Sequence, residues 1–203
     1  LFDKSIKYPY IYSMLKKILR KCKSILVKKP FPSMVYGFKR ADGIKVENVR
    51  ISNSTFIDHK HKLKIGNNVF IGHFNFIEAS NGITIEEGCQ ITNYVSITSH
   101  SSHDSIRLYG KDYGGKNMKG YVKGEVFIGK YSFIGPHVTI MPNTKIGKGS
   151  IVASHSFIKG EFPDFSILAG NPAKIIGDTR EKDAEIIAKN PELKVSYDEW
   201  IKR

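Results

Sequence analysis

Residues 126–158 read VFIGKYSFIGPHVTIMPNTKIGKGSIVASHSFI and carry an aliphatic side chain at every sixth position, starting from Ile128. The members of this series are Ile128, Ile134, Ile140, Ile146, Val152 and Ile158. Four residues after each of the first five comes a small or modest side chain, in turn Ser132, Val138, Thr144, Ser150 and Ser156. A helix repeats every 3.6 residues and a strand every two, so a period of six indicates a repeat architecture.

The same period extends towards the N-terminus in three shorter series. They are Ile65, Ile71, Ile77 and Ile83; Ile85, Ile91 and Ile97; and, more weakly, Ile51, Ile57 and Leu63. The series change phase by two residues at Leu63/Ile65 and at Ile83/Ile85, where we expect insertions at corners. The largest break, residues 98–125, holds five glycines and four lysines and is too polar to be core. We expect it to leave the repeat as a loop excursion, and such loops often carry function.

A period of six has a simple physical interpretation, in which three hexads form one turn of a triangular solenoid. Each hexad supplies a short strand and a corner, and backbone groups pair with the coils above and below as in a parallel sheet. Glycine, which often follows the aliphatic residue, suits positions where φ is positive or a Cβ would clash. An antiparallel sandwich rich in isoleucine is the alternative, and the unbroken run at 128–158 argues against it. The sequence therefore predicts an all-β fold, a single-stranded parallel β-helix.

The repeat and the segment after it resemble a known family. Gly170-Asn171-Pro172-Ala173-Lys174 follows the last coil. Together, over roughly residues 50–177, they are similar to the maltose/galactoside O-acetyltransferase group of hexapeptide-repeat proteins and its relatives in surface-polysaccharide biosynthesis. The resemblance implies a left-handed β-helix, acetyl-CoA as co-substrate, a sugar acceptor and a homotrimer whose CoA groove is shared between subunits. It also implies O- or N-acetylation by direct transfer, without an acyl-enzyme.

His100 lies in Ile97-Thr98-Ser99-His100-Ser101, where the repeat opens into the excursion, and the resemblance places the catalytic histidine there. An imidazole can take a proton from a sugar hydroxyl near neutral pH and pass it to the leaving thiolate. His103, three residues on, could bind the acceptor, orient His100 or be a solvated loop residue. Cys89 occupies an inward repeat position, so we interpret it as a core residue and not as a nucleophile.

Further binding residues follow from the resemblance. It implies that Asn75 binds the acceptor, since an amide both donates to and accepts from hydroxyls; a structural corner asparagine is an equally open alternative. It also implies that Phe133 walls the acceptor pocket. CoA is expected along a groove near the C-terminal coils, where the candidates are Ser154, His155, Lys159, Gly160 and Lys174. Lys174 would lie near the CoA phosphates, unless it is a solvated surface lysine.

His137 and His155 are 18 residues apart, so we expect them to stack on one outer face. A zinc site of the γ-carbonic anhydrase type, which shares this fold, would need a third ligand at a suitable spacing, and the sequence offers none. We therefore expect no metal. The chain could also be an antibiotic acetyltransferase or a non-catalytic scaffold, and His100 beside a long loop argues against the scaffold.

Both ends of the chain are predicted to be helical. Residues 10–27 carry apolar side chains at helical spacing, with basic residues on the opposite face. This helix could make a peripheral membrane contact, or it could pack on the end of the solenoid and cover its exposed edge; we favour the second. We expect residues 1–45 to form this helix and a linker, residues 46–177 the β-helix, and residues 178–203 a helical tail.

Composition limits the remaining classes of protein. The chain has 203 residues, of which 40% are hydrophobic, and a formal net charge of +13. It has no run of 18 apolar residues, its first residues do not resemble a signal peptide, and Cys22 and Cys89 are too few for a disulfide framework, so we expect a cytoplasmic protein. The charge suits a phosphate-rich cofactor or an anionic membrane. Without a recognition-helix, RNP or zinc-finger pattern we do not expect nucleic acid as a partner.

Overall fold

The computed structural model of the chain describes residues 32–115 and 117–202. The chain divides into two compact units, Leu1–Ser33 and Met34–Arg203, and all the described helices and strands belong to the second. The basic helix predicted at residues 10–27 lies outside the described residues. None of the described helices is both long enough and apolar enough to cross a bilayer.

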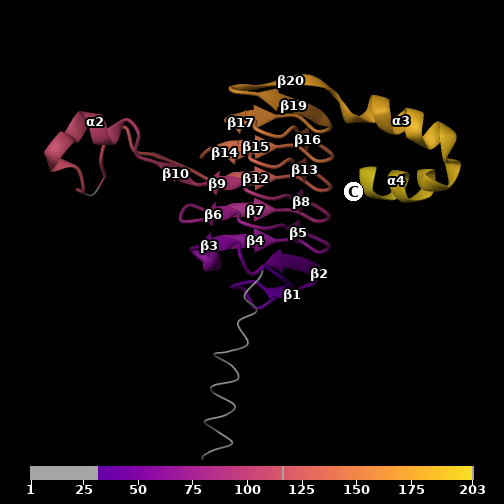
Figure 1. Cartoon of the computed structure of the whole chain (residues 1–203), viewed down its shortest axis with the longest axis horizontal. Coiled ribbons are helices and arrows are strands. Elements are labelled where there is room, and N and C mark those ends of the chain that lie inside the picture. Colours follow the sequence, from indigo (N-terminus) through magenta and orange to yellow (C-terminus); the bar gives the residue numbers. More distant parts are fainter. Residues whose placement is uncertain (1–31, 116, 203) are drawn as a thin grey trace, which may run out of the picture. The chain divides into compact units, whose positions relative to one another are not determined.

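Residues 45–170 wind into a solenoid with three parallel sheets (Figure 1). Sheet A contains β2 (Lys45–Ser52), β5 (Phe70–Ile71), β8 (Gln90–Ile91), β13 (Phe133–Ile134), β16 (Ile151–Val152) and β19 (Ser166–Gly170). Sheet B contains β3 (Phe56–Asp58), β6 (Phe76–Glu78), β9 (Ser96–Thr98), β14 (Thr139–Ile140) and β17 (Phe157–Ile158). Sheet C contains β4 (Leu63–Ile65), β7 (Ile83–Ile85), β12 (Val126–Ile128), β15 (Thr144–Ile146) and β18 (Glu161–Phe162). This architecture confirms the predicted left-handed parallel β-helix.

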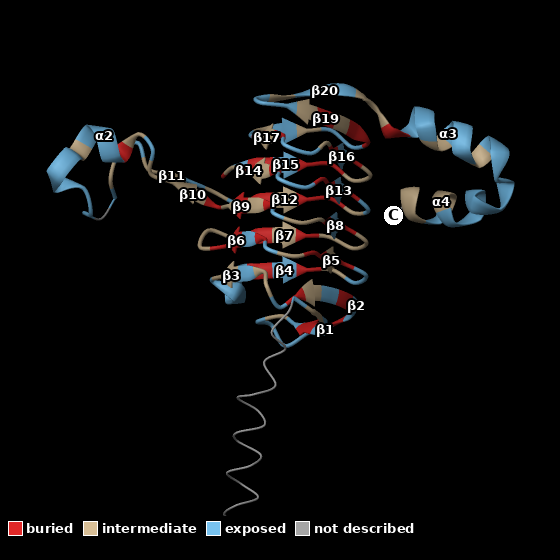
Figure 2. Ribbon diagram, viewed as in Figure 1, coloured by how far each residue is buried: buried red, intermediate tan, exposed pale blue. Residues whose placement is uncertain are grey.

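The aliphatic residues of the repeat fill the interior of the solenoid. Ile134 pairs in register with Ile91 on one side and Val152 on the other, and all three side chains are fully buried. Buried residues run through the strands of every coil, whereas the helices of the excursion and the C-terminus are largely exposed (Figure 2). Cys89 is also fully buried, which confirms that it is a core residue.

The first coils are two residues longer than the later ones. Ile57, Ile77 and Ile97 stack in register at intervals of 20 residues, whereas Ile140 and Ile158 stack at an interval of 18. The extra residues lie in the corners between sheets B and C, at residues 59–62 and 79–82. The first of these corners contains the short helix η1 (Lys60–Lys62). These corners explain the phase shifts in the sequence and confirm the predicted insertions.

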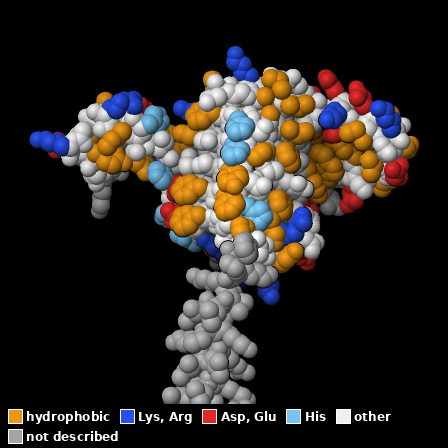
Figure 3. Space-filling model, in the orientation of Figure 1, with side chains coloured by type: hydrophobic (Ala, Val, Ile, Leu, Met, Phe, Trp, Pro, Cys, Tyr) orange, Lys and Arg blue, Asp and Glu red, His pale blue; other side chains and the backbone are white. Residues whose placement is uncertain are grey.

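The corners between sheets A and B carry a column of stacked rings. Phe74, Tyr94, His137 and His155 have positive φ angles of 58° to 61°. Their rings stack in that order, with centroid separations of 5.2, 4.9 and 4.7 Å. Histidine and hydrophobic side chains gather along this face of the solenoid (Figure 3). The predicted stacking of His137 and His155 on one outer face is confirmed.

Residues 99–125 leave the solenoid between sheets B and C. β10 (His100–Ser101) pairs antiparallel with β11 (Val122–Lys123), so the excursion departs and returns as a two-stranded ribbon. Its outer part holds α2 (Ser105–Tyr109) and η2 (Gly110–Asp112). The predicted loop excursion is therefore organised at its base and carries a helix at its tip (Figure 1).

Both edges of sheet A are covered by an antiparallel strand. β1 (Met34–Lys39) pairs with β2, and β20 (Ala173–Asp178) pairs with β19. The chain then forms α3 (Thr179–Lys189), η3 (Pro191–Leu193) and α4 (Lys194–Ile201). The Trp200 ring of α4 packs against Tyr131 and Phe165 of the solenoid, with centroids 4.8 and 5.9 Å away. These hairpins satisfy backbone groups that the ends of the sheet would otherwise expose.

Candidate active site

His100 lies at the point where the chain leaves the solenoid. It follows β9 and opens β10, beside the corner between sheets B and C (Figure 1). Its side chain is 36% exposed. The imidazole is therefore partly accessible to a substrate.

Glu78 holds the inner edge of the His100 ring. The distance from His100 Nδ1 to Glu78 Oε2 is 2.7 Å. The same carboxylate accepts hydrogen bonds from the Ser80 backbone N–H at 2.7 Å, from the Ser99 backbone N–H at 3.2 Å and from Ser99 Oγ at 3.0 Å. Glu78 is only 4% exposed. A buried carboxylate needs such donors, and this one has them on both oxygens.

The length of the coil brings Glu78 to His100. β6 pairs with β9 so that Glu78 lies opposite Thr98, two residues before the histidine. The four-residue corner after β6 then places Ser80 Oγ 3.2 Å from His100 Nδ1. The corner insertion that lengthens the first coils thus supplies residues that surround the imidazole. Sequence reasoning missed Glu78, although a coil of 20 residues would have placed it beside the histidine.

The charge of Glu78 determines which nitrogen of His100 can act as a base. Burial by itself raises the pKa of Glu78, but hydrogen bonds from Ser80, Ser99 and His100 outweigh it and lower the pKa to about 2. The carboxylate is therefore ionised at neutral pH and accepts the proton of His100 Nδ1. The other ring nitrogen, Nε2, then carries a free lone pair. An imidazole in this tautomer, backed by a carboxylate, is suited to accept a proton.

Tyr121 covers one face of the His100 ring. The two rings are stacked, with centroids 5.6 Å apart and an angle of 8° between their planes. Burial raises the pKa of Tyr121, and the nearby Tyr113 and Glu78 raise it further, so its hydroxyl stays neutral at physiological pH. Sequence reasoning missed this residue as well, because no repeat position marks it.

The structure places His103 within the excursion and not against His100. Its Nδ1 lies 2.8 Å from Ser101 Oγ, and its Nε2 lies 3.4 Å from Asp104 Oδ2. Its side chain is about as exposed as that of Asp104. Both ring nitrogens therefore face neighbours in the excursion, which fits the solvated-loop alternative better than the orientation of His100.

Asn75 is buried inside the coil. It is 2% exposed, and its amide donates to the Thr92 carbonyl at 2.8 Å and accepts from the Val95 N–H at 2.7 Å. Both ends of the amide are used to join two coils. The geometry supports the structural alternative for Asn75, and it leaves the side chain without a free polar atom directed at an acceptor.

The remaining predicted residues lie on several faces of the solenoid. Phe133 is 40% exposed on sheet A, away from the corner that holds His100. Ser154 and His155 occupy a corner between sheets A and B. Lys159 and Gly160 occupy the corner between sheets B and C, two coils beyond His100 and on the same edge of the solenoid. Lys174 belongs to β20 at the C-terminal end. Of these, only the pair Lys159 and Gly160 shares an edge of the solenoid with His100.

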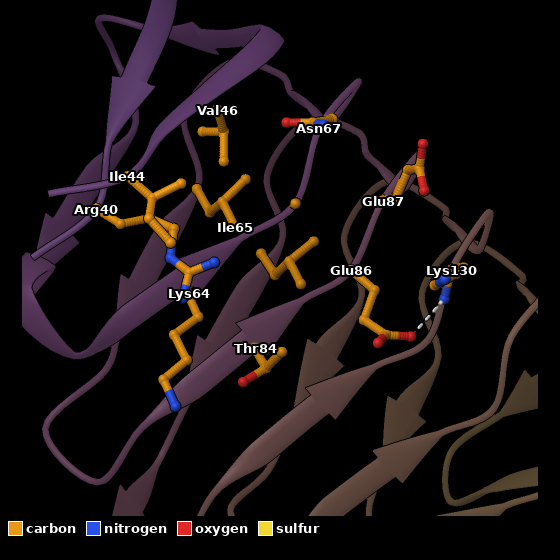
Figure 4. A pocket seen from close by; sticks show the side chains of 12 residues that line it. Arg40, Ile44, Val46, Lys64, Ile65, Asn67, Thr84, Glu86, Glu87 and Lys130 are labelled. Carbon is orange, nitrogen blue, oxygen red and sulfur yellow. Dashed lines mark hydrogen bonds between the residues drawn. The ribbon is translucent and has the colours of Figure 1, made fainter. Parts of the chain in front are cut away.

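A separate pocket of about 390 Å³ opens beside the first coils of sheet C (Figure 4). Arg40 and Lys64 line one part of it, and Glu86 and Glu87 line another. Glu86 Oε2 accepts a hydrogen bond from the Lys130 backbone N–H at 3.2 Å. The pocket thus carries charges of both signs and contains none of the residues of the His100 cluster.

One group of side chains in the described ranges has the composition of a metal site. Asp58, His59 and Glu78 present ligand atoms within 4.8 Å of one another. Both oxygens of Glu78 already accept hydrogen bonds from Ser80, Ser99 and His100, so this carboxylate has a different role. The stacked rings of His137 and His155 cannot aim their in-plane lone pairs at one ion between them.

Comparisons with known proteins agree with this fold. Residues 125–160 match the bacterial transferase hexapeptide family (six repeats). The chain is 30% identical over 161 residues to dTDP-4-amino-4,6-dideoxy-D-glucose acyltransferase of Escherichia coli, covering 69% of this chain and 84% of that protein. The crystal structure of AntD, an N-acyltransferase from Bacillus cereus in complex with dTDP and 3-hydroxybutyryl-CoA, superposes with a TM-score of 0.58 at 22% identity, over 75% of this chain and 90% of AntD.

Several relatives are matched over a smaller part of their length. The putative lipopolysaccharide biosynthesis O-acetyl transferase WbbJ of Escherichia coli strain K12 is 32% identical over 113 residues, which are 54% of this chain and 57% of WbbJ. Two further relatives are covered over only 39% and 40% of their own lengths. The identity and coverage of the sugar acyltransferase from Escherichia coli, together with the hexapeptide match and the shared fold, are sufficient to assign a family. The chain belongs to the hexapeptide-repeat transferase family.

Proposed function

We propose that this protein transfers an acetyl group from acetyl-CoA to a hydroxyl or amino group of a sugar, with His100 as the general base. The observation that carries the proposal is the 2.7 Å contact between His100 Nδ1 and the buried, ionised Glu78. In the neutral imidazole, this contact leaves the lone pair on Nε2. A base with this arrangement, next to a loop large enough to contact a substrate, is what direct acyl transfer needs.

The reaction proceeds in one ternary complex. His100 Nε2 accepts the proton of the acceptor O–H or N–H as the oxygen or nitrogen attacks the thioester carbonyl. The C–S bond then breaks, and the imidazolium returns the proton to the departing sulfur to give CoA-SH. Glu78 stabilises the imidazolium that forms between these steps, in the way that a carboxylate supports histidine in other acyl-transfer sites. Cys89 takes no part, because burial raises its pKa to about 12 and keeps it a thiol.

The sugar acceptor is proposed from the relatives and not from a bound ligand. The acyltransferase from Escherichia coli is named for a dTDP-linked amino sugar, and WbbJ for lipopolysaccharide biosynthesis. We extend this to an acceptor used in surface-polysaccharide assembly inside the cytoplasm. Lys159 and Gly160 share an edge of the solenoid with His100, which supports a CoA path along that edge, and a homotrimer would close this path with a neighbouring subunit.

The test compares the two histidines at the start of the excursion. Release of CoA thiol is followed with acetyl-CoA and a panel of free, nucleotide-linked and lipid-linked sugars and of antibiotics, for wild type, His100→Ala and His103→Ala. We expect His100→Ala to lower kcat about 10²- to 10⁴-fold, the range for loss of a general base. We expect His103→Ala to have a much smaller effect, since His103 faces Ser101 and Asp104. Turnover of His100→Ala at the wild-type rate would refute the assignment, and turnover of an antibiotic in place of every sugar would change the acceptor class.

A further inference from the structure

The bond to Glu78 is one restraint on the orientation of the His100 ring. It fixes the position of Nδ1, which lies 2.7 Å from Glu78 Oε2. A rotation of the ring about its Cβ–Cγ bond breaks that contact and swings Nε2 through an arc. For general-base catalysis Nε2 must point at one place, because a misplacement of about 1 Å can cost 10²-fold in rate. Something must therefore limit the rotation.

Tyr121 is in a position to do so. In the ribbon, His100 pairs with Lys123, and Tyr121 comes immediately before β11, two residues from Lys123. Diagonal neighbours of this kind are within reach when one of them is aromatic. The rings of Tyr121 and His100 lie nearly parallel, 8° apart, with centroids separated by 5.6 Å. The stacked ring blocks the rotation on its side.

We propose that Tyr121 is a positioning residue for His100, which rests on the proposed role of His100 as the base. Glu78 holds the imidazole at its edge and Tyr121 holds it at its face, and the two together direct Nε2. The two restraints come from different parts of the chain, Glu78 from the solenoid and Tyr121 from the returning limb of the excursion.

Through Tyr121, the excursion is in direct contact with the proposed base, His100. Tyr121 also lines a pocket of about 380 Å³ together with Tyr113, Met118 and Lys123. The ring that restrains His100 is thus built into the local structure of the excursion, and the way the excursion folds sets the angle of the imidazole.

The experiment measures the tautomer of His100 directly. Nitrogen-15 NMR of the free protein reports which ring nitrogen carries the proton, without any substrate. In wild type and in Tyr121→Phe, which keeps the ring, we expect His100 to be the Nδ1–H tautomer. In Tyr121→Ala and Tyr121→Leu we expect a mixture with the Nε2–H tautomer, because the ring can turn away from Glu78. Tyr197→Ala is the matched control, since Tyr197 packs edge-on against Trp200 within α4, with centroids 5.5 Å apart, and lies outside the His100 cluster.

Kinetics provide the second measurement. We expect Tyr121→Ala to lower kcat about 10- to 100-fold with little change in KM for acetyl-CoA. We expect Tyr121→Phe to keep most of the wild-type kcat. A pure Nδ1–H tautomer in both Tyr121→Ala and Tyr121→Leu would overturn the proposal, as would Tyr121→Phe behaving like Tyr121→Ala. The NMR result stands even if no acyl transfer is found, so failure of the proposed function and failure of the positioning role remain distinguishable. Tyr121→Leu keeps bulk at the site if Tyr121→Ala disturbs the ribbon.

Discussion

At the scale of single residues, Glu78 combines a structural and a chemical role. It is a buried carboxylate that lies opposite Asp58 and Thr98 of the neighbouring coils. Its burial would be costly without hydrogen-bond donors. Ser80, Ser99 and His100 supply them. The same contacts that stabilise the charge also fix the histidine. Loss of the charge should therefore affect folding and activity together.

The pKa of Glu78 makes the folding effect depend on pH. Its ordinary value of 4.5 is lowered to about 2 in the folded protein. A lowered pKa stabilises the fold at pH values above 4.5, and this contribution is lost as pH falls from 4.5 towards 2. For such a shift it amounts to about 3 kcal/mol. We expect Glu78→Gln to reduce the free energy of unfolding near neutral pH by an amount of this order.

The measurement is urea unfolding of wild type and Glu78→Gln at several pH values. The difference in the free energy of unfolding between wild type and Glu78→Gln should be largest above pH about 5 and should become smaller in acid. Glu161→Gln is a suitable control, because Glu161 is exposed on β18. A difference of constant size at every pH would mean that the charge of Glu78 does not stabilise the fold.

The residues that could be predicted from the sequence are those that the repeat or the resemblance marks. His100 is predicted because the resemblance places a catalytic histidine where the repeat opens into the excursion. Glu78 and Tyr121 are not, because each becomes a site residue only through register: Glu78 through the length of its coil and Tyr121 through the pairing of β10 with β11. Asn75 illustrates the opposite case. The resemblance implies that it binds the acceptor, but in the structure its side chain is buried and forms a hydrogen bond between two coils.

At the scale of elements, the solenoid was almost fully predictable and the excursion was not. A period of six residues, interrupted by phase shifts of two, predicts the coil lengths, the inward-facing residues and the corner insertions. It does so because stacked coils repeat the same pattern in every turn. The excursion has no such repetition. Its ribbon depends on two antiparallel pairs, His100 with Lys123 and Ser101 with Val122. Neither pair leaves a periodic signal in the sequence.

This difference leads to a prediction about the excursion as a unit. β10 and β11 end opposite each other at Ser101 and Val122, so a two-residue Asn-Gly turn can join them in place of residues 102–121. Of the residues in α2, only Ser105 is buried. We expect the shortened protein to unfold within a few degrees of wild type, since the solenoid core is unchanged, and to lose at least as much activity as Tyr121→Ala.

Differential scanning calorimetry and the thiol-release assay together check this outcome. A cooperative transition near the wild-type temperature, with strongly reduced turnover, would assign the excursion to catalysis and the coils to stability. If the shortened chain failed to unfold cooperatively, the excursion would be part of the folding unit. The prediction that the coils are stable without the excursion would then be wrong.

At the scale of the whole molecule, the solenoid exposes a group of large aromatic side chains on and beside sheet B. Phe56 and Phe76 point outward from sheet B and stack on each other, with centroids 5.8 Å apart. They are 60% and 42% exposed, and the neighbouring corner adds Phe74 and Tyr94 at 49% and 51%. A patch of this kind on a protein surface usually marks a contact with another chain. The proposed homotrimer is a natural occupant, because it would bring a second subunit to the sheet that precedes His100.

We expect wild type to sediment with the mass of three chains, against 22.9 kDa for one. Phe56→Glu combined with Phe76→Glu places two carboxylates in the patch, whose burial in an interface is unfavourable, and should give single chains that still unfold cooperatively but turn over far more slowly. Val195→Glu is the matched control, since Val195 is 76% exposed on α4 and away from the patch. A double variant that stays trimeric would place the interface on another face. One that becomes monomeric at full activity would show that each chain carries a complete site, and the shared CoA path would then have to be abandoned.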